Sequence, residues 1–163
     1  MSLVEVLVAL VVLSVGMLGI AAMFVESVRN SRTALLRTQA INLVSDMADR
    51  IRANASARGA YDLARDAATP AERDCAPSRA SVGANCSITD LAADDLARWT
   101  QSVNGALPAS GGAAPLREVL YIAPVNPGEP ERYSIFVAWR EPGEDQPLSY
   151  RSDVLILPRP PLS

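Results

Sequence analysis

The sequence VLVALVVLSVGMLGIAAMFV occupies residues 6–25 and contains no charged residue and no proline. Its only polar side chain is that of Ser14. Because an α-helix rises about 1.5 Å per residue, these residues would span roughly 30 Å, which is the thickness of the hydrocarbon core of a bilayer. The stretch predicts a membrane-spanning helix, and we expect residues 1–25 to form the transmembrane part of the chain.

Glu5 lies inside the start of this apolar helix. A carboxylate at the edge of lipid costs free energy and is expected to have a partner. Within one helical turn the nearest cation is the α-amino group of Met1, and the amino terminus of a neighbouring copy would serve equally well. Two interpretations stay open: Glu5 takes part in assembly, or its side chain extends to the membrane interface without a partner.

Apolar residues continue beyond the membrane stretch at steps of three and four, which is typical of one face of an amphipathic helix. No proline or glycine interrupts the chain between Gly19 and Gly59. We therefore expect one continuous helix over residues 2–54, with residues 26–54 as its amphipathic half. Gly16 and Gly19 are the weak points of this helix, because each costs about 1 kcal/mol relative to alanine.

A second amphipathic helix is predicted after Ser87, which with Asp90 resembles a capping box. Three segments rich in β-branched and aromatic residues follow, at 116–123, 131–139 and 149–157, with short proline- and glycine-containing connections. They predict an antiparallel meander. Alternation in the middle strand places four large side chains on the face expected to pack against the long helix: Tyr133, Ile135, Val137 and Trp139.

Composition argues against enzymatic chemistry. The sequence contains neither histidine nor lysine, so the commonest general base and metal ligand is missing. No phosphate-binding glycine motif is present, and the arginines are scattered rather than interleaved with aromatic residues. We expect no enzyme activity, no cofactor or metal, and no nucleic-acid partner.

The N-terminal sequence SLVEVLVALVVLSVGMLGIAAM (2–23) resembles the start of a mature type IV pilin-like protein, cut by prepilin peptidase. Met1 stands where that family usually has an N-methylated phenylalanine, and Glu5 is in register with the glutamate that pairs with the N-terminus of an adjacent subunit. The segment DMADRIRAN (46–54) resembles the minor-pilin family called PilV, the type IV pilus modification proteins. The acidic helix with Trp99 and the following Leu-Pro turn extend this resemblance to about residue 110.

The resemblance implies an α+β pilin-like fold, in which the long N-terminal helix packs on a three- to four-stranded antiparallel sheet. A disulfide-bearing loop and the second helix lie between them, and residues 55–163 form a periplasmic head. In the exported context, Cys75 and Cys86 are expected to form a disulfide that closes a loop of about 12 residues and stabilises the fold by roughly 3 kcal/mol. In related pilins the region of Gly16 and Gly19 can unwind in the filament. Close helix packing in the membrane is the alternative.

The resemblance also implies a function. The chain would be a minor pilin, held in the inner membrane by a single pass with its head in the periplasm and then built into the tip of the extracellular pilus. Other minor pilins and the major pilin would be its partners through the N-terminal helix, together with a tip adhesin, with roles in cell adhesion and twitching motility. A minor pseudopilin of type II secretion and a membrane-tethered binding module are the alternatives.

By the positive-inside rule, Arg29, Arg32 and Arg37 would instead place the head in the cytoplasm, because nothing basic precedes the membrane stretch. The basic leader of the pilin family would reverse that orientation. The cysteine pair supports the reversal, since disulfides persist in oxidising compartments.

Overall fold

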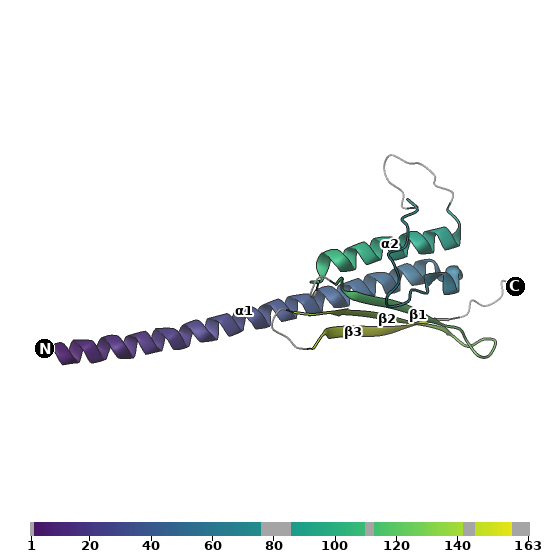
Figure 1. Cartoon of the computed structure of the whole chain (residues 1–163). Helices are drawn as coiled ribbons and strands as arrows, with labels where there is room; N and C mark the ends of the chain where they lie inside the picture. The colour runs from purple at the N-terminus through teal and green to yellow at the C-terminus, as the bar shows by residue number, and fades with distance from the viewer. Residues whose placement is uncertain (1, 76–85, 110–112, 142–145, 158–163) are drawn as a thin grey trace. The chain divides into compact units, whose positions relative to one another are not determined.

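The computed structural model describes residues 2–75, 86–109, 113–141 and 146–157. Within these residues, two α-helices, a 3-10 helix and three strands follow in the order α1 (Leu3–Ala53), η1 (Ala55–Tyr61, the 3-10 helix), α2 (Ile88–Ala106), β1 (Leu116–Ile122), β2 (Glu131–Trp139) and β3 (Leu148–Ile156) (Figure 1). The expected α+β pilin-like fold is confirmed. The chain forms two compact units, Met1–Leu36 and Arg37–Ser163.

Helix α1 is continuous over 51 residues, as the spacing of apolar residues and the absence of proline predict. Glu5 lies in its first turn, and Arg50 and Arg52 lie in its last turn, so both ends carry the charge that the helix dipole favours. The helix ends at Ala53, and the side-chain amide of the buried Asn54 donates to the carbonyl of Ile88 at 2.8 Å. This bond ties the end of α1 to the start of α2.

The core of the unit Arg37–Ser163 forms between the final turns of α1, helix α2 and one face of the sheet. Figure 1 shows α2 running alongside the end of α1, with the sheet on the other side of α1. Trp99 of α2 is completely buried, and its indole N–H donates to the carbonyl oxygen of Leu43 in α1 at 2.8 Å. Trp99 therefore anchors α2 to the end of α1. The main apolar core residues are Ala40, Val44, Met47, Ile51, Ala92, Leu96, Val103, Val119, Ile135, Val137 and Val154.

The start of α2 has the geometry that the sequence predicts. Ser87 is the N-cap, and its hydroxyl accepts from the backbone N–H of Asp90 at 3.1 Å. The carboxylate of Asp90 in turn accepts from the backbone N–H of Ser87 at 3.3 Å. The capping box is confirmed, with aspartate in place of the usual glutamate, and it fixes where α2 begins immediately after Cys86.

The described strands form a three-stranded antiparallel sheet in the order β1-β2-β3. The register is continuous from Leu116 opposite Ala138 to Ile122 opposite Arg132, and from Glu131 opposite Ile156 to Trp139 opposite Leu148. The meander and the buried face of β2 are confirmed, because the four large side chains predicted to share that face are at most 3% exposed.

Candidate functional site: the N-terminal helix and its head

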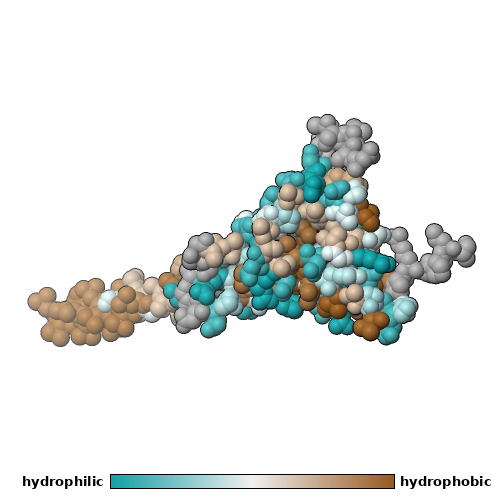
Figure 2. All heavy atoms as spheres, turned by 45° about the vertical axis from the view of Figure 1, so that its right-hand side comes forward, coloured by the Kyte–Doolittle hydropathy of each residue, from teal (hydrophilic) through white to brown (hydrophobic). Residues whose placement is uncertain are grey.

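The N-terminal half of α1 presents apolar side chains on every side. Exposure is 88% for Leu3, 64% for Leu7 and 71% for Leu18, and an 18-residue window of the helix has a mean hydropathy of 2.7 with none of it buried. Figure 2 shows these side chains as a continuous apolar surface. By length and composition this helix can cross a membrane. So much exposed apolar surface fits contact with lipid or with other apolar helices.

The single hydroxyl within this apolar stretch is satisfied within the helix. Ser14 donates to the carbonyl oxygen of Val11 at 2.8 Å. Because a polar side chain in hydrocarbon is costly without a hydrogen bond, this internal bond removes the need for an external partner. Ser14 is accordingly compatible with lipid on all sides.

Glu5 is different, because its carboxylate is exposed and has no ion pair among the residues that the structure describes. Its backbone N–H donates to the carbonyl oxygen of Ser2 at 3.0 Å, which places it in the first helical turn. Met1, the predicted partner through its amino group, lies outside the described residues. The role of Glu5 in assembly therefore stays a prediction.

Gly16 and Gly19 lie in regular α-helix. A Cβ atom built on either glycine would meet no other atom within 4 Å. Both positions are therefore open on the surface of α1, where a neighbouring helix could approach the backbone closely. Local unwinding and close packing both stay predictions.

Polar contacts between residues far apart in the sequence, which sequence reasoning missed, hold the end of α1 to the head. Arg50 pairs with Asp46 at 2.9 Å and also with Asp95 of α2 at 3.0 Å. The hydroxyl of Tyr61 donates to the second oxygen of Asp95 at 2.6 Å. Burial, followed by the hydrogen bond to Asp95, raises the pKa of Tyr61 well above its usual range. Only the pair between Arg50 and Asp46, four residues apart on one helix, has a signal in the sequence.

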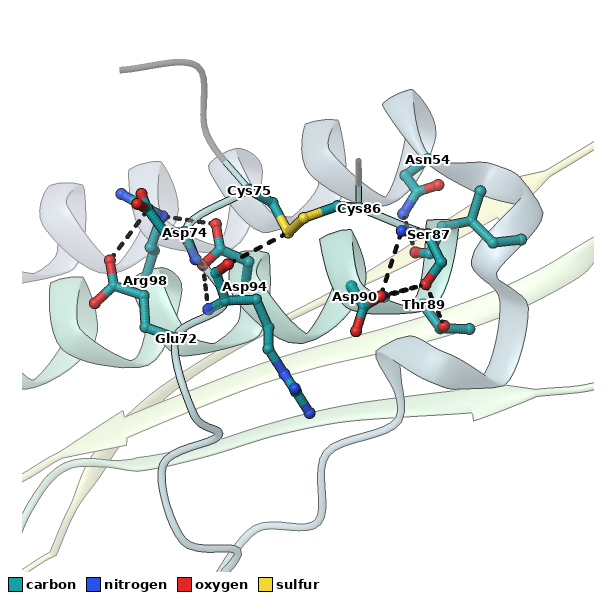
Figure 3. The surroundings of a disulfide bond; sticks show 12 residues. Asn54, Glu72, Asp74, Cys75, Cys86, Ser87, Thr89, Asp90, Asp94 and Arg98 are labelled. Atoms are coloured by element: carbon teal, nitrogen blue, oxygen red, sulfur yellow. Dashed lines mark hydrogen bonds and ion pairs between the residues drawn. A yellow bond between two sulfur atoms is a disulfide. The ribbon is translucent and has the colours of Figure 1, made fainter. Parts of the chain in front are cut away.

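Cys75 and Cys86 are joined by a disulfide with their Cα atoms 5.8 Å apart (Figure 3). Figure 3 shows the bond lying beside the start of α2, because Cys86 immediately precedes the N-cap Ser87. The bond therefore connects the segment before residue 76 directly to α2. Residues 76–85, which the disulfide closes into a loop, lie outside the described residues.

A buried carboxylate also holds the segment before residue 76 against α2. Asp94 of α2 has a side chain only 2% exposed, and it accepts from the backbone N–H groups of Arg73 at 2.9 Å and Asp74 at 3.0 Å. It also pairs with Arg98 at 2.8 Å. Burial opposes ionisation of this carboxyl, but the bonds from Arg98 and from the backbone prevail and hold the pKa of Asp94 below its ordinary value. Asp94 thus positions the chain just before Cys75.

Arg117 of β1 is a second buried polar group with no sequence signal. It is 7% exposed, and it donates to the hydroxyl of Thr100 at 3.0 Å, the carbonyl of Ala67 at 3.2 Å and the hydroxyl of Thr69 at 3.3 Å. Because no carboxylate pairs with it among the described residues, burial lowers the pKa of Arg117. The guanidinium connects the sheet, α2 and the segment at 67–69.

The described residues contain no group of three or more histidine, cysteine, aspartate or glutamate side chains that could hold a metal ion. Several acidic side chains of the head are paired with arginines, as in Arg65 with Glu118 at 3.0 Å and Arg58 with Glu131 at 3.2 Å. These ion pairs connect segments of the head that are far apart in the sequence.

The family model described as Tt1218-like, type IV pilin Tt1218, matches residues 22–97. No curated protein and no solved structure matches the chain. The matched region runs from the apolar part of α1 through η1 and the disulfide into α2. Together with the long apolar helix, the match supports a type IV pilin family for this chain and a pilin role anchored in the membrane.

Proposed function

We propose that this chain is a minor pilin of the type IV pilus, of the PilV kind. The observation that carries the proposal is an unburied apolar helix with Glu5 in its first turn, continuous with a disulfide-bonded α+β head. The Tt1218-like match supports a type IV pilin, and the resemblance of residues 46–54 to PilV is the reason for the minor-pilin assignment. Type IV pilins are structural proteins rather than enzymes.

In the proposed pathway, prepilin peptidase processes the precursor, and the helix over residues 1–25 holds the subunit in the inner membrane. Residues 26–54 continue the helix, and residues 55–163 form the periplasmic head. Assembly then moves the apolar helix from lipid into the fibre, where it packs against the helices of other minor pilins and of the major pilin. The head would lie near the tip, next to an adhesin.

Two physical terms drive this assembly. Packing of apolar helices against one another provides association energy, and the open surface at Gly16 and Gly19 permits close approach. Glu5 fixes the axial position of one subunit relative to the next, because its carboxylate pairs with the amino terminus at Met1 of a neighbouring subunit. An unpaired charge among packed apolar helices costs several kcal/mol, so subunits shifted along the axis are disfavoured.

A minor pseudopilin of type II secretion would use a similar helix and fold, and the type IV pilin match favours the pilus.

A deletion of the gene in the native bacterium distinguishes the pilin from the pseudopilin. Surface pili and secreted enzymes are measured in one culture, with re-expression of the chain as the control. We expect fewer pili, less twitching and intact secretion. Normal pili with blocked secretion would make the protein a pseudopilin, and a head that binds a surface ligand with both functions intact would make it a tethered binding module.

A further inference from the structure

The two edges of the sheet differ in how their backbone groups are used. At the β1 edge, Leu63 and Val119 exchange two backbone hydrogen bonds of 2.8 and 3.0 Å. The N–H of Tyr121, two residues further along, donates to the carboxylate of Asp62 at 3.0 Å. Residues 62 and 63 therefore cover the β1 edge.

The register then decides which groups of β3 point outward. The N–H and C=O groups of Val119 bond to Leu63 and so point away from β2. Its neighbours Glu118 and Leu120 therefore bond to Phe136 and Ser134 of β2. The odd-numbered residues of β2 then bond to β3. The β3 residues that bond to β2 are then Leu148, Tyr150, Ser152, Val154 and Ile156. The N–H and C=O groups of the intervening residues 149, 151, 153 and 155 point away from the sheet.

These outward groups have no partner among the residues that the structure describes, because no backbone or side-chain hydrogen bond reaches them there. The strand is nine residues long, has a continuous register without a bulge, and contains no proline. Proteins usually protect such an edge with a bulge, a proline, charged side chains or a covering segment, and of these the described part of β3 has only its charges, Arg151 and Asp153. An uncovered edge of this length can accept a further strand.

The side chains beside this edge carry opposite charges. Arg151 is held over the ring of Phe136 at 5.0 Å, donates to the hydroxyl of Ser134 at 3.2 Å and pairs with Glu118 at 3.5 Å. Its position is therefore fixed, while its side chain stays 48% exposed and can still meet a further acidic group. Asp153 is exposed and has no ion pair or hydrogen bond among the described residues. In an antiparallel pair, residues directly opposite each other interact, and opposite charges there are favourable.

We propose that the free edge of β3 binds an extended segment of another protein as an added antiparallel strand, with an acidic residue opposite Arg151 and a basic residue opposite Asp153. The surface is independent of the membrane helix and of the pilin role. Backbone hydrogen bonds from residues 149–155 would hold the segment, and the two charges would select its register.

A second copy of this chain fits less well. Parallel pairing of two β3 strands would bring like charges together at residues 151 and 153. Antiparallel pairing about Ser152 would match the charges but reverse one copy relative to the other. Figure 1 shows residues 37–53 of α1 running along the strands, so these segments of the two copies would run in opposite directions.

The probe is a fluorescent peptide with the sequence PLSYRSDVLIL, which is that of residues 147–157. When the peptide lies antiparallel to β3 with its central serine opposite Ser152, its aspartate faces Arg151 and its arginine faces Asp153. The peptide has no membrane helix, so it is free to bind in this direction. The control peptide PLSYDSRVLIL exchanges the two charges. Binding to the full-length protein in detergent micelles is followed by fluorescence anisotropy, with tryptophan emission to verify folding.

We expect the wild-type protein to bind the first peptide about tenfold more tightly than the control peptide. The double variant Arg151→Asp with Asp153→Arg should invert this preference. Leu155→Pro removes an outward N–H without breaking a bond to β2, and should weaken binding of both peptides at unchanged folding. Equal affinity for the two peptides, or binding of neither, would overturn the proposal.

A separate measurement tests the second copy. In the antiparallel arrangement Ser152 would face its own counterpart at a Cα separation of about 4.5 Å, which suits a disulfide. We expect Ser152→Cys to stay monomeric on non-reducing gels, like Ser149→Cys, in which the two cysteines would lie far apart. A disulfide dimer formed by Ser152→Cys alone would assign the edge to a second copy and refute a different partner.

Discussion

Replacing Asp94 with alanine is expected to destabilise the head by about 2–3 kcal/mol. The side chain is 2% exposed and holds the backbone N–H groups of Arg73 and Asp74 together with the guanidinium of Arg98. A hydrogen bond to a charged group contributes about 1.5–3 kcal/mol. Arg73, Asp74 and part of Arg98 can reach water once the carboxylate is gone, so the three contributions do not add fully.

The same carboxylate makes stability depend on pH. Because the folded pKa of Asp94 lies below its ordinary value, the stabilisation is present above the unfolded pKa of about 4 and is lost as pH falls through the folded pKa. Asp94→Ala should therefore lose more stability relative to wild type at pH 7 than at pH 3. The two proteins should converge as the wild-type carboxyl becomes protonated.

Urea denaturation of the full chain in detergent micelles measures this difference, with the buried Trp99 and Trp139 as fluorescent reporters of the head. Asp153→Ala is the matched control, since Asp153 is exposed and has no bonded partner among the described residues. A loss below 0.5 kcal/mol (a small fraction of the range for charged hydrogen bonds), or an equal loss in the control, would refute the role given to Asp94.

Three further predictions concern the stability of the head. Trp99→Phe should cost about 1–2 kcal/mol in urea denaturation, because it removes the indole hydrogen bond to α1 and some buried volume. Arg58 has φ 47° and ψ −124°, a conformation suited to glycine, so Arg58→Gly should be about 1 kcal/mol more stable than Arg58→Ala. Both variants lose the ion pair with Glu131, so their difference measures the backbone conformation alone. Changing Cys75 and Cys86 together to serine should cost roughly 3 kcal/mol and leave the head folded by circular dichroism.

The two α-helices and the three strands have local signals in the sequence, and these signals were sufficient to predict them, whereas η1 was not predicted. An unbroken run at steps of three and four predicts α1, and Ser87 with Asp90 predicts the start of α2. Alternation in β2 identifies the face of Ile135 and Val137 that becomes buried. Each signal depends on residues that are close in sequence, so each can be read without knowing the tertiary structure.

The polar contacts inside the head could not be predicted in this way. In β1 the apolar side chains of Leu116, Leu120 and Ile122 share the exposed face, whereas Arg117 lies on the buried face. Alternation of polarity alone would favour the opposite orientation. The buried arginine is tolerated because Thr100 and the segment at 67–69 supply its acceptors, and those residues are 17 to 50 positions away in the chain.

For Glu5 the residue could be predicted from the sequence, but its partner could not be observed in a single chain. Glu5 was identified from its position in the sequence, and the exposed helix around it is consistent with lipid or neighbouring helices. Its partner belongs to another subunit in the proposed mechanism, so a single chain cannot contain the contact. The contact of Glu5 with a neighbouring subunit can be tested only by a measurement on assembled fibres.

Incorporation of Glu5→Ala into sheared pili is that measurement. The variant and Glu5→Asp are expressed in the native bacterium, and the amount in the membrane is compared with the amount in the pilus fraction. We expect Glu5→Ala at the wild-type level in the membrane and absent from pili, with partial recovery for Glu5→Asp, which keeps the charge. Glu5→Ala at the wild-type level in sheared pili would contradict the account.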